Sequence, residues 1–257
     1  MKCLIIAAGQ GSRLSTKSDS KPLIPLLGLS LVERVILTAK KGGLTDFYVV
    51  TGYNGETVRR FLDRFSQRRD IKITHVINDD WEKENGISVL KAKDMLKENF
   101  ILLMSDHIFD ESIIAKLKNE KITDDEVMLV VDYNIKTNKL VDIDDVTKVL
   151  VEDNKILDTG KDIKKYNAYD TGIFLCSPAI FNAIEESSGN GDTSLTGGVR
   201  VLAKKGKAKA LDIEDDFWID VDDEKALKKA EGKLLATLEK PVSYTHLRAH
   251  ETPEHLV

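Results

Sequence analysis

An apolar run that ends in a glycine-rich turn stands near the start of the chain and constrains its fold most strongly. The run is Leu4–Ala8, and the turn that follows carries Gly9 and Gly11. Continuous apolar runs of this length are typical of strands buried on both faces, as in a parallel sheet covered by helices. Glycines at the end of such a strand let the backbone approach a phosphate closely. The opening segment therefore predicts an α/β protein with an anion-binding loop.

Two cations accompany this loop. Arg13 lies in the turn, and Lys21 follows in the sequence Lys-Pro-Leu. A guanidinium matches phosphate oxygens with a fork of donors, and an ammonium acts as a compact point charge. The Walker spacing is absent, and Leu14 stands where a dinucleotide fingerprint needs its third glycine. We therefore expect the loop to bind a nucleoside triphosphate, and an ordinary strand and turn with incidental charges is the alternative.

Strand-like and helix-like segments alternate through the first half. Helical spacing of apolar residues occurs at Ser30–Lys41, Glu56–Phe65 and Ile87–Leu96, and strand-like runs occur at Phe47–Thr51, Ile71–Ile77 and Phe100–Met104. This alternation predicts a doubly wound, mostly parallel sheet with helices on both faces, a Rossmann-like fold that binds ligands outside the carboxyl ends of its strands. The second half is less regular and predicts an antiparallel β excursion within the same domain.

Composition narrows the class of protein. The chain has 257 residues, of which 42% are hydrophobic and 32% charged, and its net charge is −5. These values suit one large globular domain and do not suggest a partner that is a nucleic acid or an anionic membrane. Cys3 and Cys176 both lie in apolar runs, as expected for buried thiols of a cytoplasmic protein. No segment approaches the roughly 20 apolar residues of a membrane span.

The last residues of the chain have a different character. Neither helical nor strand periodicity continues beyond about residue 240, so we expect a domain at 1–240 and a tail at 241–257 that arises from cloning or read-through. The tail holds three of the five histidines, His246, His250 and His255. A metal site in the tail is the alternative interpretation.

Carboxylates follow two of the predicted strands. Asp106 comes soon after Phe100–Met104, where a side chain faces the ligand crevice and suits Mg²⁺, although it could instead cap a helix. Asp220 and Asp222 alternate along a later short strand and therefore point the same way. Either one could supply a second metal ligand, and a solvated acidic edge is the alternative. We expect His107 to have a packing or supporting role.

Residues 1–240 resemble, in order, the nucleotidyltransferases that join a sugar phosphate or alcohol phosphate to a nucleotide. The resemblance rests on Ala-Ala-Gly-x-Gly-x-Arg-Leu ending at Leu14, followed by Lys21 and Pro22. Within this superfamily, Asn78–Ser88 resembles the cytidylyltransferases that act on choline phosphate or inositol phosphate, and Tyr169–Phe174 is most similar to the inositol-1-phosphate cytidylyltransferases. The resemblance implies that CTP and inositol 1-phosphate give CDP-inositol and pyrophosphate, for the synthesis of di-myo-inositol phosphate, with Mg²⁺ as cofactor.

The resemblance also implies roles for individual residues. Because the attacking phosphate is already anionic, this transfer needs positioning and charge neutralisation rather than a catalytic triad. Arg13 and Lys21 would serve catalysis, with metal held by Asp106 and by Asp220 or Asp222. The nucleotide would contact Ala7, Ala8, Gly9, Gln10, Gly11, Asn85, Gly86 and Ser88, and the acceptor would contact Lys161 and Asp170. From the residues alone, Asn85 is an equally natural helix cap, Lys161 a loop lysine and Asp170 a turn cap.

Partners and rival functions follow from the same resemblance. It implies CTP and a phosphorylated polyol as ligands, leaves room for a homodimer, and points to a fused or partner membrane synthase domain absent from this chain. Many sugar nucleotidyltransferases carry a proline and a threonine between the arginine and the lysine, whereas the segment Ser15–Ser20 contains no proline, which weakens a sugar-nucleotide interpretation. The alternatives are a sugar 1-phosphate or choline phosphate as acceptor, or a non-catalytic nucleotide-sensing subunit. Aromatic residues make up only 6%, which disfavours a choline site.

Overall fold

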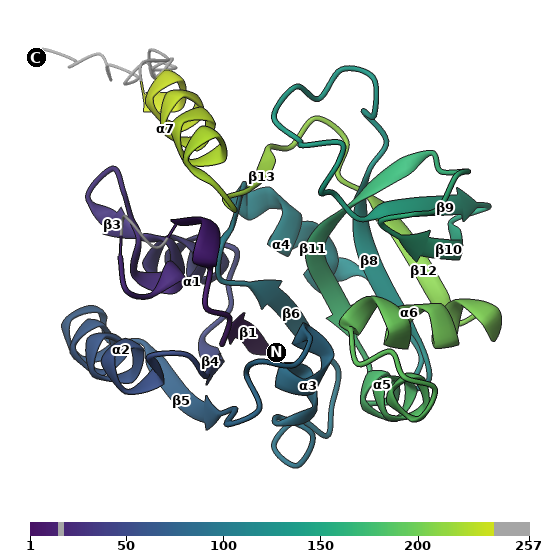
Figure 1. The fold of residues 1–257 in the computed structure, drawn as a ribbon, viewed down its shortest axis with the longest axis horizontal. Helices are drawn as coiled ribbons and strands as arrows, with labels where there is room; N and C mark the ends of the chain where they lie inside the picture. The colour runs from purple at the N-terminus through teal and green to yellow at the C-terminus, as the bar shows by residue number, and fades with distance from the viewer. Residues whose placement is uncertain (15–17, 239–257) are drawn as a thin grey trace, which may run out of the picture.

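A mixed β-sheet forms the centre of the protein. The computed structural model describes residues 1–14 and 18–238, so the predicted tail at 241–257 and its histidines lie outside the described residues. The strands of the first half are β1 (Lys2–Ala7), β4 (Asp46–Thr51), β5 (Lys72–Ile77) and β6 (Phe100–Met104). The strands of the second half are β8 (Val127–Asp132), β9 (Lys148–Glu152), β10 (Lys155–Gly160), β11 (Ala168–Cys176) and β12 (Ala208–Asp212). These nine strands make one sheet in the order β5-β4-β1-β6-β11-β8-β12-β10-β9 (Figure 1).

The first half of the sheet is parallel, and the second half is mixed, because β12 runs parallel to β8 while the other pairings there are antiparallel. β1 lies between β4 and β6, with β5 beyond β4, and all these neighbours run parallel. β11 runs antiparallel to both β6 and β8, and β10 runs antiparallel to β9 and β12. The prediction of a mostly parallel sheet is therefore wrong, whereas the predicted antiparallel excursion is present. For β9 and β10 the cause of the antiparallel pairing lies in the turn between them. Asp153 and Asn154 form a two-residue left-handed turn, and such a turn can join only antiparallel strands.

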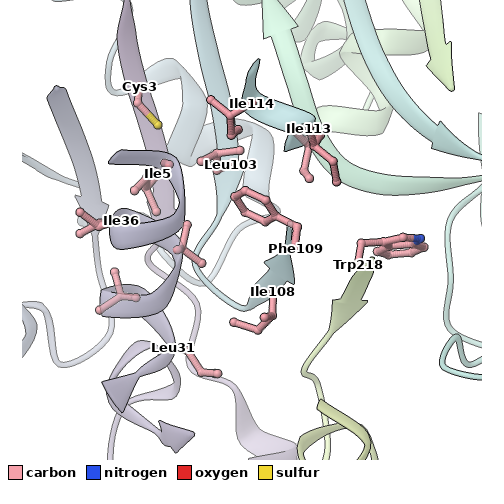
Figure 2. Close-up of a cluster of buried hydrophobic side chains, with 14 of the residues drawn as sticks. Cys3, Ile5, Leu31, Ile36, Leu103, Ile108, Phe109, Ile113, Ile114 and Trp218 are labelled. Atoms are coloured by element: carbon pink, nitrogen blue, oxygen red, sulfur yellow. The ribbon is translucent and has the colours of Figure 1, made fainter. Parts of the chain in front are cut away.

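Helices cover both faces of the sheet. Side chains of α1 (Leu31–Lys41), α2 (Gly55–Arg69), α4 (Glu111–Asn119) and α7 (Glu224–Leu238) belong to one buried cluster, and those of α3 (Asn85–Leu90), α5 (Ala179–Gly189) and α6 (Leu195–Lys204) belong to another. Alternate residues of β1 reach the two clusters, with Cys3 and Ile5 on one side and Leu4 and Ile6 on the other. Figure 2 shows the first cluster between β1, β6 and their covering helices. No helix in the described residues is long and apolar enough to cross a membrane.

Two helices differ from their sequence patterns. α3 begins at Asn85 and ends at Leu90, well before the predicted end at residue 96. α6 is not evident from periodicity, because Gly197 and Gly198 stand in its first turns. A Cβ on Gly197 would collide with the Ser187 side chain, and one on Gly198 with Ile184. These glycines therefore allow α5 and α6 to pack closely, a tertiary requirement that overrides helix propensity.

Short elements position the functional edge. A hairpin is formed by β2 (Pro25–Leu26) and β3 (Leu29–Ser30), and single 3₁₀ turns span Ser12–Leu14 and Lys21–Leu23. Beyond β6, β7 (His107–Phe109) pairs antiparallel with β13 (Trp218–Asp220), which places Asp220 opposite His107. In β11 the register shifts between Asp170 and Phe174, and Gly172 adopts a φ of +72° at this irregularity. The chain therefore bends where β11 meets the two-stranded sheet of β7 and β13.

The irregularity in β11 predicts a stability effect at Gly172. Gly172→Ala should lower the free energy of unfolding by about 2 kcal/mol, because the left-handed backbone is strained for alanine and its Cβ would collide with the His107 ring. Gly189→Ala is the matched control, since no atom lies within 4 Å of its added Cβ. Urea unfolding followed by circular dichroism measures both. Equal stability of the two variants would contradict the described bend.

Candidate active site

A cavity of about 740 Å³ opens at the carboxyl ends of β1 and β6. Its walls come from the first glycine loop, the segment Met104–His107, the loop between β8 and β9, and the segment from Trp218 into α7. Nine residues proposed from the sequence line it: Gly9, Arg13, Lys21, Asn85, Asp106, Lys161, Asp170, Asp220 and Asp222. The other six do not line it: Ala7, Ala8, Gln10, Gly11, Gly86 and Ser88. The structure thus gathers every proposed charged residue around one cavity.

Lys21 is buried between two of the carboxylates. Only 9% of the residue is exposed, and its Nζ donates hydrogen bonds to Asp106 and Asp222. Burial alone would lower the pKa of the ammonium, but the two carboxylates outweigh that cost and raise the pKa above its usual value. Lys21 therefore stays charged and holds the ends of β6 and β13 together.

Gly11 makes room for this lysine. Its φ is +64°, and a Cβ at this position would overlap the stem of Lys21. The second glycine of the loop is therefore required by a close packing contact as well as by its left-handed backbone. This packing explains why the glycine pattern and the lysine occur together in the sequence.

Arg13 lies at the mouth of the cavity and contacts two carboxylates. Its Nη1 is 2.5 Å from Asp145 and its Nη2 is 3.0 Å from Asp222, and its side chain is 55% exposed. Asp145 also accepts a hydrogen bond of 2.5 Å from Lys161. Asp145 therefore contacts both Arg13, which we expect to bind the nucleotide, and Lys161, which the resemblance assigns to the acceptor. Sequence reasoning missed Asp145, because it lies in an aperiodic acidic stretch that looks like a solvated loop.

Asp106, His107 and Asp220 form a group that could hold a metal ion. One ligand atom from each lies within 4.8 Å of the others. The Nδ1–H of His107 donates to the carbonyl of Thr171 at 2.7 Å, and its Nε2 is 3.5 Å from Asp220. The buried Oδ1 of Asp220 has no hydrogen-bond partner among the described residues. An orphaned carboxylate oxygen beside a second carboxylate fits a hard divalent cation.

Neighbouring charges affect the three carboxylates differently. Burial would raise the pKa of Asp106 and of Asp222, but Lys21 overcomes this effect and both pKa values are lowered. Burial raises the pKa of Asp220, which Lys21 does not contact. His107, expected from sequence to support packing, proves to face Asp220 directly. The antiparallel pairing of β7 with β13 creates this contact, and no local sequence signal indicates it.

The two residues assigned to the acceptor lie at the same cavity. Asp170 accepts a hydrogen bond of 2.7 Å from the Gly172 amide, and burial raises its pKa to about 6. Lys161 is exposed and contacts Asp145. A carboxyl group and an ammonium thus stand on the side of the cavity formed by β11 and its preceding loop.

The start of α3 shows that the helix-cap interpretation of Asn85 is wrong. Glu84, not Asn85, is the N-cap residue, and the Oδ1 of Asn85 accepts a hydrogen bond of 2.9 Å from the Leu195 amide. A Cβ on Gly86 would collide with the backbone of Thr193 and Ser194, just before α6, and Ser88 accepts a hydrogen bond from Asn78 at 2.9 Å. Gly86 therefore allows α3 to pack closely on the segment before α6, Ser88 holds α3 to the segment after β5, and Asn85 alone of these faces the cavity.

The remaining loop residues act through the backbone or face solvent. Ala7 and Ala8 are buried, and the carbonyl of Ala8 accepts a hydrogen bond of 3.0 Å from the Tyr53 amide. Gln10 is exposed. The side chains of the two alanines thus belong to the core beneath the loop.

Residues 3–204 match the family model of the MobA-like NTP transferase domain. The chain belongs to this family. It is 32% identical over 233 residues to a Rubrobacter xylanophilus protein named bifunctional IPC transferase and DIPP synthase, covering 90% of this chain and 51% of that protein. An Aquifex aeolicus protein of the same name is 31% identical, with coverage of 93% and 53%. The chain therefore spans about half the length of the curated relatives it matches.

Solved structures show the same fold. The inositol-1-phosphate CTP transferase from T. maritima superposes with a TM-score of 0.81 at 24% identity, covering 94% of this chain and 97% of that one. A putative glucose-1-phosphate thymidylyltransferase from Bacillus anthracis gives a TM-score of 0.75 at 20% identity, covering 91% and 94%. The protein thus has the mixed α/β nucleotidyltransferase fold.

The raised pKa of Asp170 predicts a dependence of stability on pH. Between roughly pH 4 and 6 the folded protein binds a proton at Asp170 that the unfolded chain releases, so this residue's contribution to stability falls as pH rises. Asp170→Asn should therefore gain on the order of 1 kcal/mol relative to the native protein across this window. Urea unfolding at both pH values, with exposed Asp162→Asn as control, measures the difference. A constant difference at the two pH values would contradict the described burial.

Proposed function

We propose that this chain is a Mg²⁺-dependent cytidylyltransferase that joins CTP and inositol 1-phosphate to give CDP-inositol and pyrophosphate. The observation that carries the proposal is the placement of buried Lys21 between Asp106 and Asp222, beside the unpartnered oxygen of Asp220. Such a site combines a fixed cation for phosphate with carboxylates for a metal. The names of the Rubrobacter and Aquifex relatives support the inositol phosphate substrate.

The reaction requires little proton chemistry from the protein. An oxygen of the acceptor phosphate attacks the α-phosphorus of CTP, a new P–O bond forms, and the bond to the bridging oxygen of pyrophosphate breaks. Lys21 neutralises charge on the α-phosphate and the attacking phosphate, while Arg13 binds the departing β- and γ-phosphates. Asp106 and Asp220, with Asp222 nearby, would hold Mg²⁺, which supplies further charge neutralisation when bound.

The paired charges suggest how CTP enters. Lys21 and Arg13 already contact Asp106, Asp222 and Asp145, so their charges are compensated by the protein itself. A triphosphate would displace the carboxylates from these cations, and the freed carboxylates would then favour a divalent cation. We infer that metal and nucleotide bind together. Gly9 and Asn85 would contact the nucleotide, and the side-chain amide of Asn85, whose hydrogens bond to none of the described residues, could donate to a base edge.

The cavity also suits a phosphorylated polyol. Lys161 would bind the acceptor phosphate, and Asp170 would accept hydrogen bonds from its hydroxyls. Among the described lining residues only Phe174 and Trp218 are aromatic besides His107, too few for a cage around a quaternary ammonium. This composition favours inositol phosphate over choline phosphate. We infer that a synthase activity, as in the names of the longer relatives, consumes the product.

Substrate specificity tests this proposal directly. Pyrophosphate release is measured with Mg²⁺ for each of the four ribonucleoside triphosphates, combined with inositol 1-phosphate, glucose 1-phosphate or choline phosphate. We expect rapid release only with CTP and inositol 1-phosphate. Release with glucose 1-phosphate instead would overturn the acceptor assignment, and nucleotide binding without release would favour a sensing subunit.

The charged centre predicts which substitutions abolish turnover. Lys21→Met and Asp106→Asn should each lower kcat by at least about 100-fold, because each removes charge aimed at the transferring group. Lys205→Met is the control, since that lysine is exposed and pairs with Glu186 outside the cavity. Circular dichroism verifies folding before steady-state kinetics. Retention of most activity by folded Lys21→Met would contradict the proposed role.

A further inference from the structure

A buried carboxyl group outside the cavity connects two parts of the candidate active site. Asp132 ends β8, and only 2% of the residue is exposed. Its Oδ2 accepts hydrogen bonds from the indole Nε1 of Trp218 at 2.9 Å and the amide of Asn138 at 2.7 Å. Its Oδ1 accepts one from the backbone amide of Asn134 at 2.8 Å. No lysine or arginine pairs with it in the part of the chain that the structure describes.

The donors come from two segments that reach the cavity independently. Asn134 and Asn138 lie at the start of the loop between β8 and β9, and residues 135–147 of this loop supply much of the cavity wall. Trp218 opens β13, two residues before Asp220. One carboxyl group therefore fixes both the beginning of the loop and the strand that carries a candidate metal ligand.

Further contacts make the start of the loop well defined. The Oδ1 of Asn138 accepts a hydrogen bond of 2.9 Å from the Leu140 amide, and Asn134 donates one of 3.2 Å to the carbonyl of Glu214. The far part of the same loop holds Asp145, which contacts Arg13 and Lys161. A shift of the loop's first turn would therefore reach the cations on which the phosphates are proposed to bind.

The chemistry of the side chain matters at this position. Three donors converge on Asp132, and a carboxyl group with two acceptor oxygens can satisfy all of them. In Asp132→Asn the new NH₂ group would face another donor. That donor would be either the backbone amide of Asn134 or the side-chain donors of Trp218 and Asn138. Such a mismatch in a buried site breaks hydrogen bonds without removing much volume.

We propose that Asp132 is a positioning residue that couples the acceptor side of the cavity to the metal side. It does not line the cavity, so it acts through Asn138 and Trp218. The assignment of the two sides rests on the proposed cytidylyltransferase function. The coupling itself rests only on the hydrogen bonds of Asp132.

Three variants separate the effect of Asp132 on the loop between β8 and β9 from its effect on β13. Asn138→Ala removes the donor on the loop, Trp218→Phe removes the indole donor on β13, and Asp132→Asn disturbs both. We expect Asn138→Ala to raise the KM for inositol 1-phosphate, and Trp218→Phe to raise the Mg²⁺ concentration needed for half-maximal activity. Asp132→Asn should raise both by about tenfold or more, as for residues that orient metal ligands. Asp94→Asn, at a fully exposed carboxylate, is the matched control.

A readout that needs no turnover keeps the test independent of the proposed function. The chain has two tryptophans, so the indole N–H resonance of Trp218 can be assigned in a ¹H–¹⁵N spectrum by its loss in Trp218→Phe. We expect this resonance to shift and exchange faster with solvent in Asp132→Asn but not in Asp94→Asn. An unchanged resonance would overturn the coupling, whichever substrates the protein uses.

The kinetic outcomes are equally decisive. Asp132→Asn could lower stability while leaving unchanged the KM for inositol 1-phosphate and the Mg²⁺ concentration for half-maximal activity. That result would mean that Asp132 has only a structural role, and it would overturn the proposal. If Asp132→Asn does not fold, the split between Asn138→Ala and Trp218→Phe carries the test, and equal effects of these two on both constants would contradict it. Failure of the native protein to release pyrophosphate from any substrate pair would instead refute the proposed function.

Discussion

The ion pairs of Lys21 with Asp106 and Asp222 are the interaction on which the rest of the site depends. They connect the ends of β6 and β13, two elements far apart in the sequence, beneath the first glycine loop. Gly11 packs on the lysine stem, so the loop and the carboxylates share one support. A lysine so buried is stable only because two carboxylates compensate its desolvation. Loop, lysine and carboxylates therefore form a single structural unit.

The ion pairs between the cations and carboxylates of the cavity also affect how the proposed substrates bind. Arg13 and Lys21 contact carboxylates of the protein, and these carboxylates include Asp106, which also belongs to the group that could hold a metal ion. Anionic substrates must exchange one set of partners for another, which couples the proposed binding of phosphate to that of metal. Asp145 extends this exchange to the loop between β8 and β9. Asp132 anchors the start of that loop, so its geometry depends on a residue outside the cavity.

The sequence predicted those features that local pattern determines. A buried strand before a glycine turn indicated β1 and its loop, and carboxylates near strand ends indicated that Asp106 and either Asp220 or Asp222 belong to one site. The mostly parallel sheet was wrong, because β11 inserts antiparallel between β6 and β8 through contacts that no local pattern encodes. Asp145, His107 and Asp132 depend on long-range pairing in the same way.

We propose that Lys21 occupies the carboxylates until substrate arrives, and the binding of Mn²⁺, a paramagnetic substitute for Mg²⁺, tests this proposal. Electron paramagnetic resonance measures free Mn²⁺ during titration of the native protein and of Lys21→Met, with and without CTP. We expect weak binding by the native protein alone, tighter binding with CTP, and tighter binding by Lys21→Met even without CTP. Equal Mn²⁺ affinity of the native protein and Lys21→Met in the absence of CTP would overturn the proposal.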